Sequence, residues 1–474
     1  MTRSSTSSPA EILVELRRDG ENKALHHQLE HELRAAIGSG RLAAGSVLPS
    51  SRMLSAQLGL SRGVVVEAYE QLVAEGYLTT LRGGSTRVNP RVSRPAASVP
   101  AGRQPDEFRI NFAYGRPDVA EFPRAAWLKS LRRVLNDAPS ERLSYLDPRG
   151  APELRDALAS YLNRVRGTAA DGECLVICNG FAQAMGIVAE MLAANGTRRI
   201  ATEDPGQADS SAAANRFGLE VVPIPVDEDG MVVSVLDRSG ADAVVVTPAH
   251  HFPTGAVMSA ERRAALLEWA GRGPRLIIED DYDAEYRYDR EPIGALQGLA
   301  PDQVLYAGSA SKTLAPGLRL GWLIVPGHLV EQLAAVKMAN DRGSASLEQL
   351  ALADFLSRGE FDRHLRRMRA VYRERRAVLL GALRQHAPDL SPAGASAGLH
   401  VVAWLPEGLD EAAVTGRAAE FGVRVAGVGR YRFGDTDRRG GLLFGYGTLG
   451  VRDIEEGVRL IAAAVADVKA APLN

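Results

Sequence analysis

The stretch from residue 91 to residue 106 constrains the fold of this chain more than any other feature of the sequence. It holds three prolines and shows no hydrophobic periodicity, which is typical of a semi-extended linker. The chain has 474 residues, whereas an ordinary domain has about 150. We therefore predict two domains, at residues 12–89 and 108–470, joined by a linker at residues 90–107.

Charge and hydropathy limit the partners and the location of the chain. The formal net charge of −2 gives no overall attraction to nucleic acid or to an anionic membrane, so any DNA contact must come from a local patch. We find no apolar stretch long enough to span a bilayer and no apolar leader core, and we expect a cytoplasmic protein without membrane contact. Only five of the 56 basic residues are lysines. Because a primary amine forms an imine and a guanidinium does not, each lysine is a candidate for amine chemistry.

The segment before the linker has the pattern of a small helical module that binds DNA. Apolar residues recur every four positions from Leu25 and predict a helix over residues 25–38. Two short helices are expected next, one after Pro49 and one from Ser61, joined by a glycine turn. Residues 77–88 predict a small hairpin, so the whole segment is a candidate winged helix-turn-helix.

Two arginines stand where such a module would meet DNA. Arg52 and Arg62 lie at the starts of the two short helices, where free backbone amides favour phosphate, and Arg62 is placed to reach a guanine edge. We expect Arg52, Ser61, Arg62 and Gly84, in the turn of the wing, to contact DNA. Residues 1–100 hold 12 basic and 9 acidic side chains, a difference of +3, so affinity must depend on placement and dimerisation rather than bulk charge. A helical domain that binds protein is the alternative.

This segment resembles the GntR-type winged helix over nearly all of residues 12–89. The resemblance rests on residues 25–29, 40–42, 48–52, 60–62, 68–72 and 75–78. It implies a regulator that binds a double-stranded DNA operator.

Short apolar runs alternate with amphipathic helices after the linker. Residues 243–246 and 276–278 are two of these runs. Continuous apolar strands between helices predict a mainly parallel sheet that is buried on both faces, and hence an α/β fold. An arginine-rich helix is expected from about residue 361 to residue 383, followed by strands near Val401 and Leu442.

The order of these elements resembles fold-type I aminotransferases, and specifically the MocR or GabR-like branch of the GntR regulators. The markers are residues 145–150, 154–155, 180–184, 203–206, 247–255, 279–282 and 308–321. The resemblance implies an N-terminal winged helix-turn-helix and a C-terminal fold-type I aminotransferase domain. That domain would have a mainly parallel sheet flanked by helices and a smaller α+β C-terminal subdomain, and it would hold pyridoxal 5'-phosphate.

The resemblance also assigns residues to the cofactor. Lys312 would form an imine with its aldehyde, and Asp280 at the end of the strand 276–278 would keep the pyridine nitrogen protonated. Asp281 is the alternative, because adjacent strand residues face opposite ways. Tyr282 would donate to the phenolate oxygen, and His250 or His251 would lie beside the ring. The groups expected around the phosphate are Gly180, Phe181, Ala182, Ser309, Ser311 and Arg319, together with Tyr145 of a neighbouring subunit.

A tyrosine that reaches the neighbouring subunit implies a homodimer, which in this family pairs head to tail with each winged helix crossing over to its partner.

Two departures from the family pattern bear on the ligand. Gln207 stands where an aromatic side chain stacks on the ring, and Leu443 aligns with the arginine that clamps a substrate carboxylate. An apolar side chain cannot hold a carboxylate, so transamination of an α-amino acid is disfavoured.

These features predict a transcription regulator that senses pyridoxal 5'-phosphate, or an amine or amino acid that reacts at Lys312, and that is not an enzyme. Control of genes for synthesis of the cofactor is one assignment that the resemblance allows. The rival is a working aminotransferase with an accessory DNA-binding domain, and a third possibility is a purely structural cofactor pocket. We expect no metal site, because His26, His27 and His31 fall on several faces of one helix and lack a carboxylate or thiolate partner.

Overall fold

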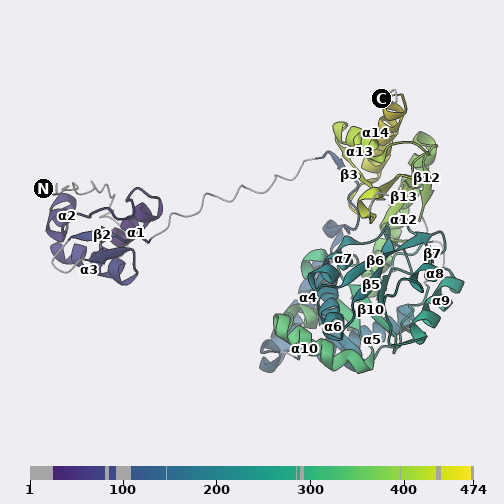
Figure 1. Cartoon of the computed structure of the whole chain (residues 1–474), viewed down its shortest axis with the longest axis horizontal. Coiled ribbons are helices and arrows are strands. Elements are labelled where there is room, and N and C mark those ends of the chain that lie inside the picture. Colours follow the sequence, from purple (N-terminus) through teal and green to yellow (C-terminus); the bar gives the residue numbers. More distant parts are fainter. Residues whose placement is uncertain are drawn as a thin grey trace. The chain divides into compact units, whose positions relative to one another are not determined.

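The computed structural model forms two compact units, Met1–Asp106 and Glu107–Asn474. Figure 1 traces both. None of the helices in the described ranges is long and apolar enough to cross a membrane. Residues 12–24 and 92–107 and Gly84, for which the sequence makes predictions, lie outside the described residues. The structure describes residues 25–80, 85–91, 108–145, 147–283, 285–288, 293–394, 397–433 and 439–470.

The first unit is the expected winged helix-turn-helix. Three helices pack around a small apolar core in which Leu29, Leu33, Leu54, Val65 and Leu72 are fully buried. The two strands pair antiparallel, with Leu78 opposite Val88. The elements are α1 (Leu25–Gly38), α2 (Ser51–Leu58), α3 (Arg62–Ala74), β1 (Leu78–Thr80) and β2 (Thr86–Val88), so the predicted helices and hairpin are confirmed.

Serine caps fix where α2 and α3 begin. The hydroxyl of Ser50 accepts a hydrogen bond from the amide of Met53, and the hydroxyl of Ser61 accepts one from the amide of Val64. Gly59 ends α2 in the left-handed conformation, with φ of 62°, which glycine adopts without strain. The tight turn between α2 and α3 follows from Gly59, which ends the first helix, and Ser61, which starts the second.

An eight-stranded sheet forms the centre of the second unit. The strand order is β4-β11-β10-β9-β8-β5-β6-β7. The pairs from β10 through β9, β8 and β5 to β6 are parallel, while β11 and β7 run antiparallel to their neighbours. The strands are β4 (Leu175–Cys178), β5 (Arg199–Asp204), β6 (Glu220–Asp227), β7 (Gly230–Met231), β8 (Ala243–Val246), β9 (Leu276–Asp280), β10 (Val304–Ser309) and β11 (Gly321–Ile324).

Helices cover both faces of this sheet, as the apolar runs predict. Ile278 packs with side chains of α6 and α10 on one face, while its neighbour Ile277 packs with side chains of α8 and α9 on the other. Further along, the second face meets α5 and α11. The flanking helices are α4 (Arg124–Asp137), α5 (Pro152–Arg166), α6 (Phe181–Ala194), α7 (Ala208–Arg216), α8 (Val233–Leu236), α9 (Ala260–Gly271), α10 (Val330–Asp341) and α11 (Ser346–Ser357).

A smaller α+β subdomain follows the long arginine-rich helix α12, and its elements gather at one end of the second unit (Figure 1). Its sheet has the order β12-β13-β16-β15 and is antiparallel. The first strand after the linker, β3, pairs with β14 of this subdomain. The elements are β3 (Ile110–Asn111), α12 (Glu360–His386), β12 (Ser391–Ala393), β13 (His400–Trp404), α13 (Glu411–Glu420), β14 (Val423–Arg424), β15 (Ala426–Gly427), β16 (Gly441–Gly445) and α14 (Val451–Ala470).

Candidate functional site

The carboxyl ends of the parallel strands bring most of the predicted site residues to one edge of the sheet. Ligands of open α/β sheets bind outside this edge. Strand β4 leads to Gly180, β8 leads to the two histidines, β9 ends at Asp280, and β10 leads to Lys312. The residues that the sequence assigns to this edge are Gly180, Phe181, Ala182, His250, His251, Asp280, Tyr282, Ser309, Ser311, Lys312 and Arg319.

Lys312 presents a mostly buried amine. Its Nζ atom donates a 2.7 Å hydrogen bond to the carbonyl oxygen of Gly115 and lies 5.9 Å from the centre of the Tyr114 ring. A Cβ atom on Gly115 would lie 3.1 Å from this Nζ atom, so only glycine leaves the amine its full space. Burial lowers the pKa of Lys312, although the carboxylates of Asp283, Asp280 and Asp209 oppose the shift. A lowered pKa favours the neutral amine, which is the nucleophilic form.

Asp280 and Asp281 face opposite sides of their strand and have different surroundings. Asp281 forms a 2.7 Å ion pair with Arg166, and the hydroxyl of Tyr306 donates to the same oxygen. Asp280 is buried, and among the described side chains only Gln207 donates to it, at 3.2 Å. Burial raises the pKa of Asp280 well above its ordinary value, and the charges of Asp281 and Asp283 add to the shift. Asp280 thus lacks a cation partner among the described residues, whereas Asp281 has one.

His250 and His251 also have different hydrogen-bond partners. The Nδ1 atom of His250 lies 3.1 Å from both carboxylate oxygens of Asp283 and 3.2 Å from the hydroxyl of Tyr282. The Nδ1 atom of His251 instead lies 2.7 Å from the hydroxyl of Thr254. Both rings are buried, and burial lowers the pKa of His251 to about 3, which keeps that ring neutral. His250 is therefore the histidine that contacts Tyr282.

The start of α6 forms an anion cradle. Gly180 has φ of 87°, and no side chain caps the helix, so the amides of Phe181 and Ala182 have no capping partner. The guanidinium of Arg319 donates to the carbonyl oxygen of Asn179, and a Cβ atom on Gly180 would lie only 2.7 Å from it. Ser309 and Ser311 lie in the adjacent loop, where the amide of Ser311 donates to the hydroxyl of Ser309. Free helix amides beside a guanidinium suit a phosphate group.

The structure does not bring Tyr145 to this cradle. Its side chain is 86% exposed, and Leu143 beside it is 59% exposed. Leu443 is fully buried on β16 and packs with Phe252, Tyr282 and Val402. The position that aligns with a carboxylate clamp is therefore part of an apolar cluster.

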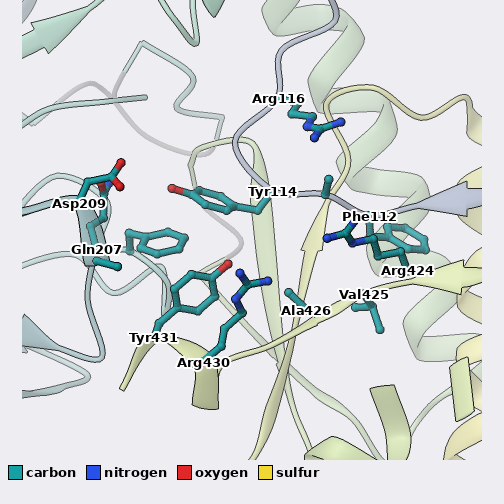
Figure 2. A pocket seen from close by; sticks show the side chains of 13 residues that line it. Phe112, Tyr114, Arg116, Gln207, Asp209, Arg424, Val425, Ala426, Arg430 and Tyr431 are labelled. Atoms are coloured by element: carbon teal, nitrogen blue, oxygen red, sulfur yellow. The ribbon is translucent and has the colours of Figure 1, made fainter. Parts of the chain in front are cut away.

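A cavity of about 390 Å³ is lined by Tyr114, the residue whose ring lies near the Lys312 amine, and is shown in Figure 2. Gln207 and Asp209 lie on one side of the view and Arg424 on the other, with Tyr114 between them. Arg116, Arg424 and Arg430 line this cavity, and within the described part of the chain their guanidinium groups form no hydrogen bond or ion pair. The cavity therefore carries three cationic side chains on its wall, together with the Tyr114 ring that lies near the Lys312 amine.

Four residues at the site were missed by sequence reasoning. Tyr114 and Gly115 contact Lys312, Asp283 binds His250, and the His400 ring lies 4.8 Å from the His250 ring. The acidic run after β9 could have indicated Asp283. No local pattern singles out the other three, which come from the segment after β3 and from β13.

In the first unit, the predicted DNA-contacting side chains lie at the starts of α2 and α3. Arg52 and Arg62 are exposed, and the Nε atom of Arg62 lies 3.5 Å from the hydroxyl of Ser51. The expectation that the nearby histidines lack carboxylate partners is wrong, because α1 and α3 each supply one. His27 lies 3.2 Å from Glu30, and His26 lies 3.5 Å from Glu67.

Comparison with known proteins gives the same division of the chain. The model of aminotransferases of class I and II matches residues 109–429, and the model of bacterial regulatory proteins of the gntR family matches residues 25–88. The probable rhizopine catabolism regulatory protein MocR of Rhizobium meliloti is 34% identical over 462 residues, 93% of each chain. The pyridoxine biosynthesis transcriptional regulator PdxR of Corynebacterium glutamicum is 32% identical over 444 residues, 93% of this chain and 95% of its own.

Two solved aminotransferase structures each match about three quarters of the chain. A multiple substrate aminotransferase of Thermococcus profundus superposes with a TM-score of 0.71 at 25% identity, over 77% of this chain and 93% of the other. An archaeal alanine:glyoxylate aminotransferase superposes with a TM-score of 0.69 at 28% identity, over 76% of this chain and 91% of the other. The chain belongs to the gntR family of bacterial regulatory proteins, as a helix-turn-helix transcription regulator whose larger domain is of the aminotransferase class I and II family.

Proposed function

We propose that this regulator binds pyridoxal 5'-phosphate at Lys312 and that its affinity for operator DNA, or the geometry of the bound DNA, depends on what occupies the second unit. The effector is the cofactor itself or an amine that reacts with it. We assign DNA binding to residues 12–89, the linker to residues 90–107 and sensing to residues 108–470. A protein that binds chromosomal DNA would act in the cytoplasm.

The observation that carries this proposal is the convergence of an amine, a buried acid and an anion cradle at one edge of the sheet. Lys312 supplies an amine whose pKa is lowered by burial. Asp280 supplies a buried carboxyl without a cation partner among the described residues. Gly180 opens a helix with uncapped amides next to the Arg319 guanidinium. These three groups match the aldehyde, the ring nitrogen and the phosphate of the cofactor.

When bound, pyridoxal 5'-phosphate supplies an aldehyde that links reversibly to primary amines and a ring that withdraws electrons. Asp280 would hold a proton at the ring nitrogen, because a buried carboxylate is stabilised by an adjacent cation. The hydroxyl of Tyr282 would donate to the ring oxygen, and the His250–Asp283 pair would orient that hydroxyl. The amides of Phe181 and Ala182, with Ser309, Ser311 and Arg319, would bind the phosphate.

An effector would approach the lysine through the cavity of Figure 2, because Tyr114 lines this cavity and its ring centre lies 5.9 Å from the Lys312 Nζ atom. Leu443 offers no charge for a carboxylate, because it is fully buried among apolar and aromatic side chains. This favours a sensor over an enzyme that transaminates α-amino acids. The cavity could instead bind an acid group of the effector at its exposed wall, through Arg116, Arg424 or Arg430.

We also propose a head-to-tail homodimer in which Tyr145 reaches the phosphate of the neighbouring subunit. Tyr145 is 86% exposed, and the large apolar side chains of Leu128, Leu135 and Leu143 are exposed on α4 and the segment after it. An apolar surface of this kind marks an interface between protein chains. Light scattering of the full chain would return the mass of a dimer, and a monomer at all concentrations would contradict the arrangement.

The deciding experiment is an absorption spectrum of the purified protein with and without borohydride reduction. We expect a band near the visible edge that disappears on reduction, with the label found on Lys312 by mass spectrometry. Lys312→Ala should abolish the band, whereas Lys129→Ala, on the exposed side of α4, should leave it unchanged. A purified protein that shows no such band and does not bind added pyridoxal 5'-phosphate would contradict the proposal.

Ligand-dependent DNA binding separates sensing from a structural role of the pocket. Fluorescence anisotropy with a DNA fragment selected by the protein from a random library measures affinity with and without pyridoxal 5'-phosphate. Because linkage is reciprocal, DNA should change the affinity for the cofactor by the same factor. If Lys312→Ala keeps the full ligand response, the pocket is structural.

The aminotransferase fold of the second unit makes catalysis the rival function. Incubation with amino acids and a keto acid acceptor distinguishes the two. A regulator is expected to complete at most one half-reaction per site, whereas sustained multiple turnover would establish an enzyme.

A further inference from the structure

Lys337 is fully buried in the second unit and takes no part in the site described above. It lies on α10, and its Nζ atom donates to both carboxylate oxygens of Asp341, at 3.0 Å and 2.7 Å, and to the hydroxyl of Ser344 at 3.1 Å. Burying an ammonium costs several kcal/mol before its partner offsets the loss. An apolar side chain would fill this space without that cost, so the pair needs an explanation other than stability.

The pair continues toward the anion cradle through Gln183. The Nε2 atom of Gln183 donates to Asp341 at 2.7 Å, and its Oε1 atom accepts a 2.7 Å hydrogen bond from the backbone amide of Asn179. Asn179 immediately precedes Gly180, the residue at the N-cap position of α6. The Lys337–Asp341 pair is therefore two hydrogen bonds from the backbone of the cradle.

The Asn179 residue is held from both ends. Its amide is bound by Gln183, and its carbonyl oxygen accepts a hydrogen bond from Arg319. Gly321 of β11 packs under the turn, because a Cβ atom there would lie 2.9 Å from the Cα atom of Gly180. Because its amide and its carbonyl are both held, Asn179 fixes the two peptide groups that lead into α6. These groups set the direction in which the amides at the start of α6 point.

The negative charge of Asp341 fixes the orientation of the Gln183 side-chain amide. Burial raises the pKa of Asp341, but hydrogen bonds from Lys337, the Gly343 amide and Gln183 outweigh it and hold the pKa below its ordinary value. A carboxylate that stays ionised accepts only, so the amide nitrogen of Gln183 must face it and the carbonyl oxygen of Gln183 must face Asn179. An apolar pair would leave Gln183 free to turn over.

We propose that Lys337, Asp341 and Gln183 are positioning residues for the phosphate cradle, which they hold ready for a phosphate through the Asn179 peptide. The inference rests on the proposed function in one respect, namely that the start of α6 binds the phosphate of pyridoxal 5'-phosphate. The three residues contact neither the ring nor the lysine. They therefore affect recognition of the phosphate and not of the rest of the cofactor.

The test compares pyridoxal 5'-phosphate with pyridoxal, which lacks the phosphate, by absorbance titration of the full chain. The double variant Lys337→Met with Asp341→Leu removes the pair without leaving a charge buried alone. We expect it to weaken binding of pyridoxal 5'-phosphate roughly tenfold, the value of about one hydrogen bond to a charged group. Binding of pyridoxal should change less than about twofold, since it does not use the cradle.

A second ion pair with the same spacing serves as the matched control. Asp354 on α11 and Arg358, the residue that caps the end of this helix, lie four apart with a 2.7 Å contact, and none of their hydrogen bonds leads to Gln183. Asp354→Leu with Arg358→Met should leave the preference for the phosphorylated form unchanged. Gln183→Leu, which keeps the Lys337–Asp341 pair, should reproduce the tenfold loss and carries the test if the double variant does not fold.

The outcomes separate this inference from the proposed function. Equal losses for both ligands, or no loss for either, would overturn the positioning role. If the unaltered protein binds pyridoxal as tightly as pyridoxal 5'-phosphate, the start of α6 is not the phosphate site, and the cradle of the proposed function falls with the inference.

Discussion

The two units of this regulator place their functional charges in opposite ways. In the winged helix, Arg52 and Arg62 are exposed at helix starts, and the only buried charged side chain among its described residues is Glu30. In the aminotransferase domain, the carboxyl groups and histidines beside the lysine are buried, and many of their neighbours are buried and charged as well. In the first unit, the side chains expected to bind DNA contribute little to the stability of the fold. In the second unit, buried charged side chains contribute both to ligand binding and to the stability of the fold.

The largest expected effect comes from breaking a buried charge pair of the second unit. Asp281→Ala leaves Arg166 buried without its carboxylate, because both side chains of this pair are 2% exposed. We expect the free energy of unfolding of the second unit to fall by about 3–5 kcal/mol. Chemical denaturation monitored by tryptophan fluorescence measures the change.

The matched control is an exposed pair in the same unit. Asp362→Ala breaks the pair with Arg164, whose side chains are 36% and 58% exposed, and should cost less than about 1 kcal/mol. Similar losses for the two variants would show that burial does not distinguish the charges of this domain.

Glu203 should give the second unit an unusual pH dependence. Burial raises its pKa from 4.5 to about 8, and its carboxyl group accepts hydrogen bonds from the amide and hydroxyl of Thr247. The folded state therefore holds a proton that the unfolded state loses above pH 4.5, so this contribution to stability is complete below that pH and falls as the pH rises toward 8.

Glu203→Gln removes this proton equilibrium while keeping an acceptor for Thr247. The stability of the unaltered protein relative to the variant should fall by about 1.4 kcal/mol for each pH unit between pH 5.5 and pH 7.5. Denaturation of both proteins at the two pH values measures the difference. A constant difference would mean that Glu203 keeps an ordinary pKa.

The smallest effect on folding should come from the winged helix. Arg62→Ala should weaken operator binding by about 1–3 kcal/mol, because an arginine contact to a base edge is lost, while the melting temperature stays unchanged. Arg41→Ala, an exposed arginine in the turn after α1, is the control for charge alone. If Arg62→Ala destabilises the unit as much as it weakens binding, the separation of binding from folding fails there.

The sequence predicts the elements of the first unit well because each depends on neighbours along the chain. The four-residue repeat before residue 38, the two serine caps and the Gly59 turn are local signals, and all appear in the structure. The apolar runs of the second unit likewise predict its parallel sheet, because a strand buried on both faces must be apolar throughout.

The site could be predicted only where one segment carries the signal. The loop around Lys312 and the start of α6 are each encoded within a few residues. The choice between Asp280 and Asp281, or between His250 and His251, depends on which face meets Arg166 or Asp283, and those partners lie far away in the sequence. Tyr114 follows a two-residue strand that pairs with β14 more than 300 residues later, so nothing near it predicts its place.

One hydrogen bond described above links the chemistry of the lysine to the backbone that leaves the linker. The Lys312 amine is bound to the carbonyl oxygen of Gly115, and the same segment begins as β3, the first strand after the linker. A new bond to this amine would leave it fewer protons to donate, and so would change the hydrogen bond that holds the Gly115 carbonyl. The covalent state of one side chain is therefore coupled to the backbone segment that carries Tyr114 and that begins as β3.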